Sequence, residues 1–299
     1  MFDLARLRLL RDLARLGTMT AVAQAHRLTS SAVSQQLATL QREARAPLFE
    51  QVGRRVRLTA EGERLAAHAE RILQAVEAAA LDLRGAAQSP QGELQVACFA
   101  SYAKRHLLPA ILRLRERHPA LRVVVRELEP TDALDAVRDG RCDLAFGFAY
   151  SLVPRPVAAD LASRTVFEEP VRLALPPSWR RKRGAVELRA LAEAEWIVGS
   201  RQTDDGLLAE RACAAAGFAP RISHTVDDYD LMLRMVAAGL GVGFVPQLAL
   251  EPSRIDGVAV RTAAGAALSR RVQAATRPAL AASPNLRALL AELGAAPIA

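Results

Sequence analysis

Residues 31–40 combine one apolar helix face with one short, uncharged polar face. The apolar side chains recur at i, i+4 and i+7, the spacing of a buried helix stripe, and they are Val33, Leu37 and Leu40. The opposite face presents Ser31, Ser34 and Gln35. Glutamine can pair with adenine through two hydrogen bonds, and serine can contact base edges or phosphate. An ordinary solvent-facing helix would carry Glu and Lys there, so the pattern favours a helix that enters the major groove of DNA.

A cluster of arginines follows this helix at the tip of a predicted hairpin around Gly53. Arginines on a hairpin are common on protein surfaces, but beside such a helix they predict a wing that contacts phosphates or the minor groove. Thr29 and Ser30 are expected to cap the helix and to lie at the same surface. The predicted DNA-binding residues are therefore Thr29, Ser30, Ser31, Ser34, Gln35, Arg54, Arg55 and Arg57. Residues 1–88 contain 13 arginines against nine acidic residues, which suits phosphate contact.

These side chains require a scaffold, and residues 1–58 predict three short helices followed by a hairpin. A long helix is expected from Thr59, within a linker over residues 59–88. Its apolar residues follow a heptad seam, the pattern of a helix that pairs with a second helix. The predicted dimerisation residues are Leu65, Ile72, Val76 and Leu83. The alternative is a single helix lying on its own domain.

Strands and helices alternate in residues 92–299, and a β-α-β-α-β order occurs twice. This order predicts parallel sheets with right-handed crossovers, arranged as two α/β lobes. Lobe I is expected at about residues 92–161 and 268–299, and lobe II at about 162–267.

A small-molecule pocket is expected between the lobes, where strands end and helices begin. Helix N-termini there would favour an anion such as a carboxylate. The predicted effector-binding residues are Ala100, Ser101, Tyr102, Ser200 and Thr203, with Phe148 and Phe244 lining the apolar part. The alternative is that the Ser and Thr residues only cap helices.

Residues 1–68 resemble the N-terminal domain of the LysR-type transcriptional regulators. The matching residues are Ala21, Ala23, Leu28, residues 31–37, Leu40, residues 47–50, residues 55–59, Glu61 and Gly62. The chain departs from the family pattern at Gln41, Ala44, Arg45 and Gln51, where Arg45 stands in place of a glycine. These departures leave the base-reading face unchanged and leave the affinity for DNA open. The resemblance implies a winged helix-turn-helix and linker helix, both mainly α, followed by an α/β, two-lobed effector domain resembling the type 2 periplasmic binding proteins.

Other classes of protein find little support in the sequence. The cysteines at 98, 142 and 213 form no CxxC pair, and the histidines form no metal-binding cluster, so neither a metal nor a cofactor is expected. No nucleophile elbow indicates an enzyme. No apolar run reaches the roughly 20 residues of a membrane span, and the N-terminus lacks a signal-peptide pattern, so we expect a cytoplasmic protein.

The expected function is that of a sequence-specific DNA-binding regulator controlled by a small, anionic effector. Its expected partners are double-stranded operator DNA, the effector, further copies in a dimer or tetramer, and RNA polymerase if it acts as an activator. One alternative is a solute-binding or enzymatic two-lobed module in which residues 1–88 serve assembly. Another is a DNA-binding regulator with a vestigial cleft.

Overall fold

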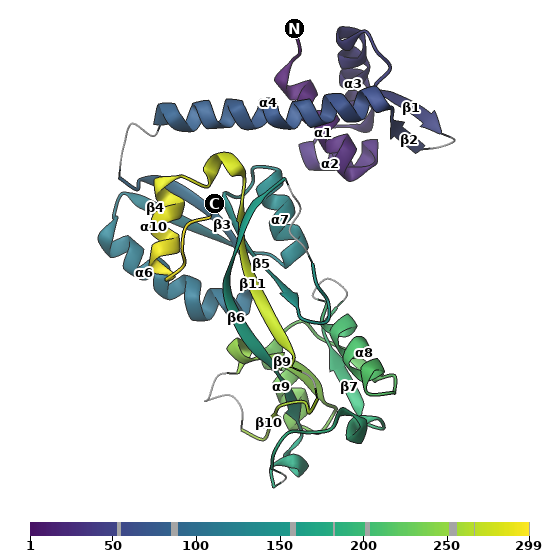
Figure 1. Cartoon of the computed structure of the whole chain (residues 1–299), viewed down its shortest axis with the longest axis vertical. Coiled ribbons are helices and arrows are strands. Elements are labelled where there is room, and N and C mark those ends of the chain that lie inside the picture. Colours follow the sequence, from purple (N-terminus) through teal and green to yellow (C-terminus); the bar gives the residue numbers. More distant parts are fainter. Residues whose placement is uncertain are drawn as a thin grey trace. The chain divides into compact units, whose positions relative to one another are not determined.

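The computed structural model divides the chain into two compact units, Met1–Ala87 and Gln88–Ala299 (Figure 1). The residues that it describes are 1–52, 55–84, 89–155, 160–181, 183–200, 204–250, 256–265 and 267–298. Side chains at 51, 52, 55, 77, 78 and 80–84 lie outside this description. The predicted residues Arg54 and Thr203, and the side chains of Arg55 and Leu83, therefore lie outside the described part of the chain.

The first unit contains three short helices, a hairpin and a long helix, as the sequence predicts. The elements are α1 (Leu4–Leu16), α2 (Met19–His26), α3 (Ser30–Ala44), β1 (Phe49–Val52), β2 (Arg55–Leu58) and α4 (Ala60–Arg84). Local capping sets the helix ends: Thr18 and Thr29 accept hydrogen bonds from the backbone amides of Ala21 and Ala32. Gly17 ends α1 in the left-handed conformation that glycine adopts without strain.

The core of this unit forms where the apolar faces of α1, α2 and α3 meet. Its fully buried side chains include Leu7, Leu10, Val22, Val33, Leu37 and Leu40. Helix α4 closes this core and approaches the chain after α3 very closely at Gly62. A β-carbon at that position would lie 1.9 Å from the carbonyl oxygen of Leu48, so only glycine fits there without a shift of the backbone.

The first lobe of the second unit is an α/β layer with helices α6 (Leu108–Arg117), α7 (Pro130–Arg138) and α10 (Pro284–Glu292). Its strands β3 (Gly92–Cys98), β4 (Leu121–Glu127) and β5 (Leu144–Tyr150) pair in parallel, which confirms the predicted parallel order. The helical segment before α6 consists of α5 (Ala100–Tyr102) and a π-helical turn over 103–107. Strand β11 (Ser269–Thr276) pairs antiparallel with β5 of this lobe.

The second lobe repeats the alternation of strands and helices. It contains β7 (Glu195–Val198), α8 (Asp205–Ala215), β8 (Arg221–Thr225), α9 (Tyr229–Ala237), β9 (Gly243–Pro246) and β10 (Ala259–Arg261). Strands β7 and β8 pair in parallel, and an apolar cluster that includes Ile197, Met232 and Val236 packs beneath them.

The sequence pattern does not predict β6 (Ala162–Leu175), the longest strand in the described part of the chain. Its first part pairs with β11, and its last part pairs with β9 and β10. Strands β6 and β11 therefore run side by side through the second unit, as Figure 1 shows. The local sequence of β6 does not indicate a strand, because it is mixed polar and contains Pro170. Its partner β11 lies about 100 residues further along the chain.

Candidate functional site

Helix α3 presents the uncharged polar face that the sequence predicts. Ser31, Ser34 and Gln35 are exposed, as are Thr29 and Ser30 at the start of the helix. The opposite face is fully buried, since the exposed fraction of Val33, Leu37 and Leu40 is 0%. The neighbouring Gln36 is also exposed, but it accepts a hydrogen bond from Arg6 Nε at 3.0 Å and so is held toward α1. The exposed face of α3 can therefore seat in a groove without any rearrangement of the core.

The chain turns sharply after α3, at the positions where the sequence departs from the family pattern. Arg45 ends the helix with φ = 52°, in the left-handed conformation that glycine usually occupies. Gln41 accepts a hydrogen bond from the backbone amide of Leu48 at 2.9 Å, so it ties the helix to the following segment. The turn is thus retained, with an arginine in a conformation that is strained for L-residues.

The hairpin of β1 and β2 follows this turn, in register from the Phe49–Leu58 pair to the Val52–Arg55 pair. Arg57 lies on β2 and is exposed. It is the one predicted wing arginine whose side chain belongs to the described part of the molecule. An exposed arginine on a hairpin strand suits contact with the DNA backbone.

The predicted seam of α4 divides into two parts. Ala69 is fully buried and Leu65 is half-buried, because this end of the helix packs on the core of its own unit. Ile72 and Val76 are 37% and 45% exposed. The apolar surface that remains available to a partner therefore begins at Ile72.

A pocket of about 270 Å³ lies in the second unit between the ends of strands β3 and β4 and the start of α9. Of the predicted effector residues, Ala100, Ser101 and Phe148 line it, together with Phe99 and Tyr229. Of the other predicted residues that the structure describes, none lines the pocket. Tyr102 is buried in an aromatic cluster with Phe146 and His106, Phe244 packs against Trp196, and the backbone amide of Ser200 donates to Asp227.

Arg270 forms one wall of this pocket and is completely buried. Its Nε donates to Glu169 at 2.8 Å, and its Nη2 donates to Glu169 and to the Ser101 hydroxyl at 2.6 and 2.8 Å. The rings of Phe99 and Phe148 each lie 4.9 Å from the guanidinium carbon. These contacts hold a charge in a water-poor environment through an ion pair and two cation–π interactions.

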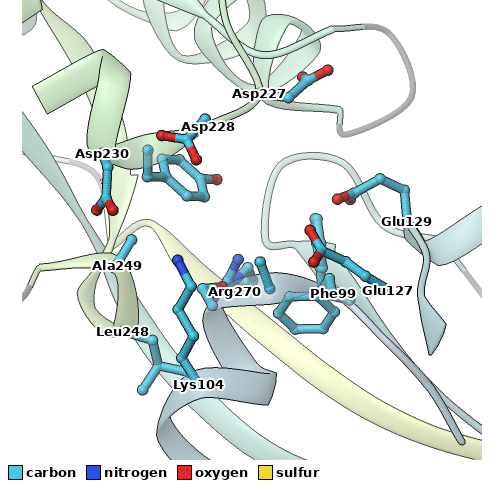
Figure 2. A pocket seen from close by; sticks show the side chains of 14 residues that line it. Phe99, Lys104, Glu127, Glu129, Asp227, Asp228, Asp230, Leu248, Ala249 and Arg270 are labelled. Atoms are coloured by element: carbon cyan, nitrogen blue, oxygen red, sulfur yellow. Dashed lines mark hydrogen bonds between the residues drawn. The ribbon is translucent and has the colours of Figure 1, made fainter. Parts of the chain in front are cut away.

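Acidic side chains dominate the rest of the pocket. Figure 2 shows Asp227 and Asp228 at the start of α9, Glu127 and Glu129 on another side, and Lys104 reaching toward the centre. Burial raises the pKa of Glu129 to about 7, and the neighbouring carboxylates of Asp205 and Asp227 raise it further. Sequence analysis missed these residues, although Glu127 and Glu129 sit at the end of a predicted parallel strand, where ligands commonly bind.

A buried hydrogen-bonded cluster joins the two lobes beside the pocket. The Tyr150 hydroxyl donates to Asp205, and the Tyr229 hydroxyl donates to the same carboxylate at 2.9 Å. Burial raises the pKa of Asp205 to about 6, although both hydroxyls favour its ionised form. Tyr150 belongs to β5 and Asp205 to α8, so this cluster fixes one lobe against the other.

The three cysteines are buried and unpaired. Burial raises the pKa of the Cys213 thiol to about 12, which keeps it protonated and unreactive at neutral pH. Among the described residues, no group of histidine, cysteine and carboxylate side chains is placed to hold a metal ion. In that same part of the chain, none of the helices combines the length and the apolar character that a membrane crossing needs.

Comparisons with known proteins cover both units. Residues 4–63 match the family "Bacterial regulatory helix-turn-helix protein, lysR family", and residues 87–297 match the "LysR substrate binding domain". The chain is 27% identical to the transcriptional dual regulator GltC of Bacillus subtilis over 219 residues, which is 73% of this chain and 71% of GltC. It is 28% identical to the transcriptional activator IlvY of Salmonella typhimurium over 239 residues, which is 77% of this chain and 78% of IlvY.

A solved structure with a similar fold is that of full-length CbnR complexed with its target DNA. It has a TM-score of 0.53 and 21% sequence identity, over 98% of this chain and 99% of CbnR. The shared fold confirms the predicted architecture of a helix-turn-helix unit followed by a two-lobed α/β domain.

Proposed function

Because the chain belongs to the LysR family of DNA-binding transcriptional regulators, which are not enzymes, we propose that α3 and the wing read its operator and that an effector in the pocket controls this binding. The observation that carries the first part is the exposed face of α3, which pairs an uncharged polar surface with a fully buried apolar one. We place this activity in the cytoplasm, where its DNA partner would be.

The reading face of α3 would supply base contacts through Ser34 and Gln35, and backbone contacts through the residues at its start. Thr29, Ser30 and Ser31 lie at the helix N-terminus, where phosphate is favoured by free amide groups and the helix dipole. Arg54, Arg55 and Arg57 would add phosphate or minor-groove contacts from the wing. The observation that supports these wing contacts is the exposure of the Arg57 side chain on β2.

The effector is proposed to present an anionic group to one wall of the pocket. Lys104 supplies positive charge there, and the Arg270 guanidinium, although paired with Glu169, lines the cavity together with the Ser101 hydroxyl to which it donates. Since Ser101 accepts its hydrogen bond from Arg270, its own proton is free to be donated to a bound oxygen.

Pairing of two copies through α4 would bring two helix-turn-helix units to one operator. Ile72 and Val76 form the exposed part of the seam, and Leu83 would continue it. Two paired helix-turn-helix units predict DNA half-sites separated by about one or more helical turns. We expect Ile72→Glu to produce monomers in analytical ultracentrifugation, and an unchanged dimer would contradict this use of the seam. Contact with RNA polymerase applies only if the bound regulator activates transcription.

The decisive experiment compares neighbouring positions of α3 on genomic fragments selected by the wild-type protein. Ser34→Ala and Gln35→Ala should reduce the preference for selected over unrelated DNA by roughly tenfold, a loss of one or two base contacts. Gln36→Ala is the matched control, because Gln36 is exposed on the same helix but is held by Arg6. Equal operator preference in all three variants would overturn the assignment of the reading face.

The wing is tested by salt dependence. Arg57→Ala should lower the slope of log affinity against log salt concentration by ~0.9, the value for one lost phosphate contact. Arg64→Ala on α4 serves as the control, because Arg64 is exposed and pairs with Glu61 at 2.9 Å. An unchanged slope for Arg57→Ala would remove this residue from the interface.

A further inference from the structure

The guanidinium of Arg270 has one nitrogen whose hydrogen-bonding capacity is unused. Nε and Nη2 are fully engaged by Glu169 and Ser101, whereas Nη1 is buried and has no partner among the described residues. A buried charged donor without an acceptor is costly. Since Arg270 lines the pocket, an oxygen atom of a bound molecule can complete its set of hydrogen bonds.

The carboxylates that line the pocket favour a positively charged group of a ligand, whereas Arg270 favours an acceptor oxygen. Glu169 already neutralises Arg270, and the described residues that line the pocket include one further cation, Lys104, and five carboxylates, which are Glu127, Glu129, Asp227, Asp228 and Asp230. Part of this charge has a local explanation, because Asp228 caps α9 through the amide of Leu231 and Asp230 lies in its first turn. Glu129 occupies the N-cap position of α7, but its side chain makes no capping hydrogen bond, and Glu127 is the last residue of β4.

Repulsion from neighbouring carboxylates adds to the effect of burial on the pKa of Glu129. Its pKa is raised to about 7 by burial and by the charges of Asp205, Asp227 and Glu127. A cation bound beside Glu129 would relieve this repulsion and compensate for the desolvation of the carboxylate. An anion alone would add to the repulsion.

The size of the pocket restricts the molecule further. A volume of about 270 Å³ corresponds to roughly nine water molecules at ~30 Å³ each, which is the space of a small metabolite such as an amino acid. Phe99, Phe148 and Leu248 give this space an apolar lining between the charged groups.

We propose that the effector is zwitterionic, with an anionic oxygen against Arg270 and Ser101 and a protonated amine or guanidinium against Glu127, Glu129 and Asp227. This inference rests on the proposed function, since it names the chemistry of the effector that the same pocket takes. It assigns the carboxylates of the second unit to recognition of positive charge, and the buried arginine to recognition of negative charge.

The test uses the full-length protein and isothermal titration calorimetry. The probes are the proteinogenic L-amino acids and the straight-chain ω-amino acids from 4-aminobutyrate to 6-aminohexanoate. The tightest binder is then compared with the matched amine that lacks the carboxylate and the matched acid that lacks the amine. We expect each matched compound to bind at least roughly tenfold more weakly, because the amine leaves the buried Nη1 of Arg270 without an acceptor and the acid leaves the half-buried Glu129 without a counter-charge.

Two substitutions separate the two ends of the site. Glu129→Gln should weaken binding of the amino acid and of the matched amine, and should leave the affinity for the matched acid unchanged or increase it. Ser101→Ala should weaken the amino acid and the matched acid and spare the amine. Glu116→Gln is the matched control, since Glu116 is an exposed glutamate on α6 that does not line the pocket.

The proposal is overturned if the matched acid binds as tightly as the amino acid, or if no amino compound binds. Simple carboxylates such as succinate, pyruvate and benzoate form the second arm of the titration. If they bind and amino compounds do not, the zwitterionic effector fails while the effector-controlled regulator stands. If the Ser34 and Gln35 variants keep their operator preference, the proposed reading of DNA fails independently of the titrations.

Discussion

Arg270 and Glu169 lie directly opposite each other on β11 and β6 and form an ion pair that is almost completely buried. The carboxylate accepts two hydrogen bonds from the guanidinium through Oε1, and its Oε2 accepts from the backbone amide of Leu248 at 2.6 Å. Leu248 and Arg270 both line the pocket. The pair therefore connects the two strands that run through the unit to the wall of the pocket.

We expect Arg270→Met to destabilise the second unit by about 3–5 kcal/mol, because it leaves the Glu169 carboxylate buried without a counter-charge. The double variant Arg270→Met with Glu169→Met should recover much of this loss. Urea denaturation gives both free energies. The control is the adjacent pair Arg271–Glu168, which occupies the next register position at 3.6 Å but is about half exposed. Arg271→Met should cost no more than about 1 kcal/mol, and an equal cost for both arginines would contradict the argument.

Gly62→Ala is expected to destabilise the first unit, against the general preference of helices for alanine. Alanine normally stabilises a helix interior by ~1 kcal/mol relative to glycine. Here the added β-carbon would lie 1.9 Å from the Leu48 carbonyl oxygen, so the expected loss is about 1–3 kcal/mol from overpacking. In Gly206→Ala the nearest atom would lie at 3.5 Å, an ordinary contact, so this control should gain stability. Thermal denaturation of both variants measures these changes. A Gly62→Ala variant that is also stabilised would refute the prediction.

Arg45→Gly should stabilise the turn after α3 by about 1 kcal/mol, because it relieves the left-handed conformation of a residue with a side chain. The expected gain comes from the left-handed conformation at position 45 and not from the loss of a positive charge. Arg42→Gly, in the last turn of the same helix, should instead lose about 1 kcal/mol through helix propensity. Chemical denaturation measures both changes. The same sign for the two substitutions would show that the turn carries no strain.

Asp205 predicts a specific dependence of stability on pH. Its pKa is raised from 3.8 to about 6 by burial, so the folded state binds the proton more tightly than the unfolded state does. Its contribution to the free energy of unfolding therefore falls as pH rises from 3.8 to about 6, and stays at the lower level above that. Asp205→Asn removes this titration while an amide can still bond to Tyr150 and Tyr229.

The measurement compares the free energy of unfolding of wild type and variant across this pH range. Relative to wild type, Asp205→Asn should gain stability with rising pH, by up to about 3 kcal/mol for a shift of roughly two pKa units. A constant difference between Asp205→Asn and wild type would contradict the assigned cause.

Local sequence signals were sufficient for the first unit and for most elements of the second. Thr18, Thr29 and Gly17 act on amides and carbonyls within a few residues, so their roles can be read from the chain. The buried stripe of Val33, Leu37 and Leu40 likewise follows from helical spacing. The exposed polar face of α3 was predictable because it is the complement of that stripe.

The pocket was predictable only in part, because its two sides come from distant segments. Ser101 and Phe148 follow from the rule that ligands bind at the carboxyl ends of parallel strands. Arg270 could not be assigned in this way, since its partners Glu169 and Ser101 lie 101 and 169 residues away in the chain. Strand β6 was missed for the same reason, because long-range pairing with β11 stabilises it where its own sequence pattern is weak.

The sequence alone was therefore enough to identify a helix-turn-helix unit, a long helix and a two-lobed domain, since caps, periodicity and family motifs are properties of short segments. The charge of the pocket emerged only from the folded chain. Glu127, Glu129, Asp227 and Arg270 become neighbours when two lobes close on one cavity. Electrostatic interactions depend on distance and burial, and neither can be read from positions along the chain.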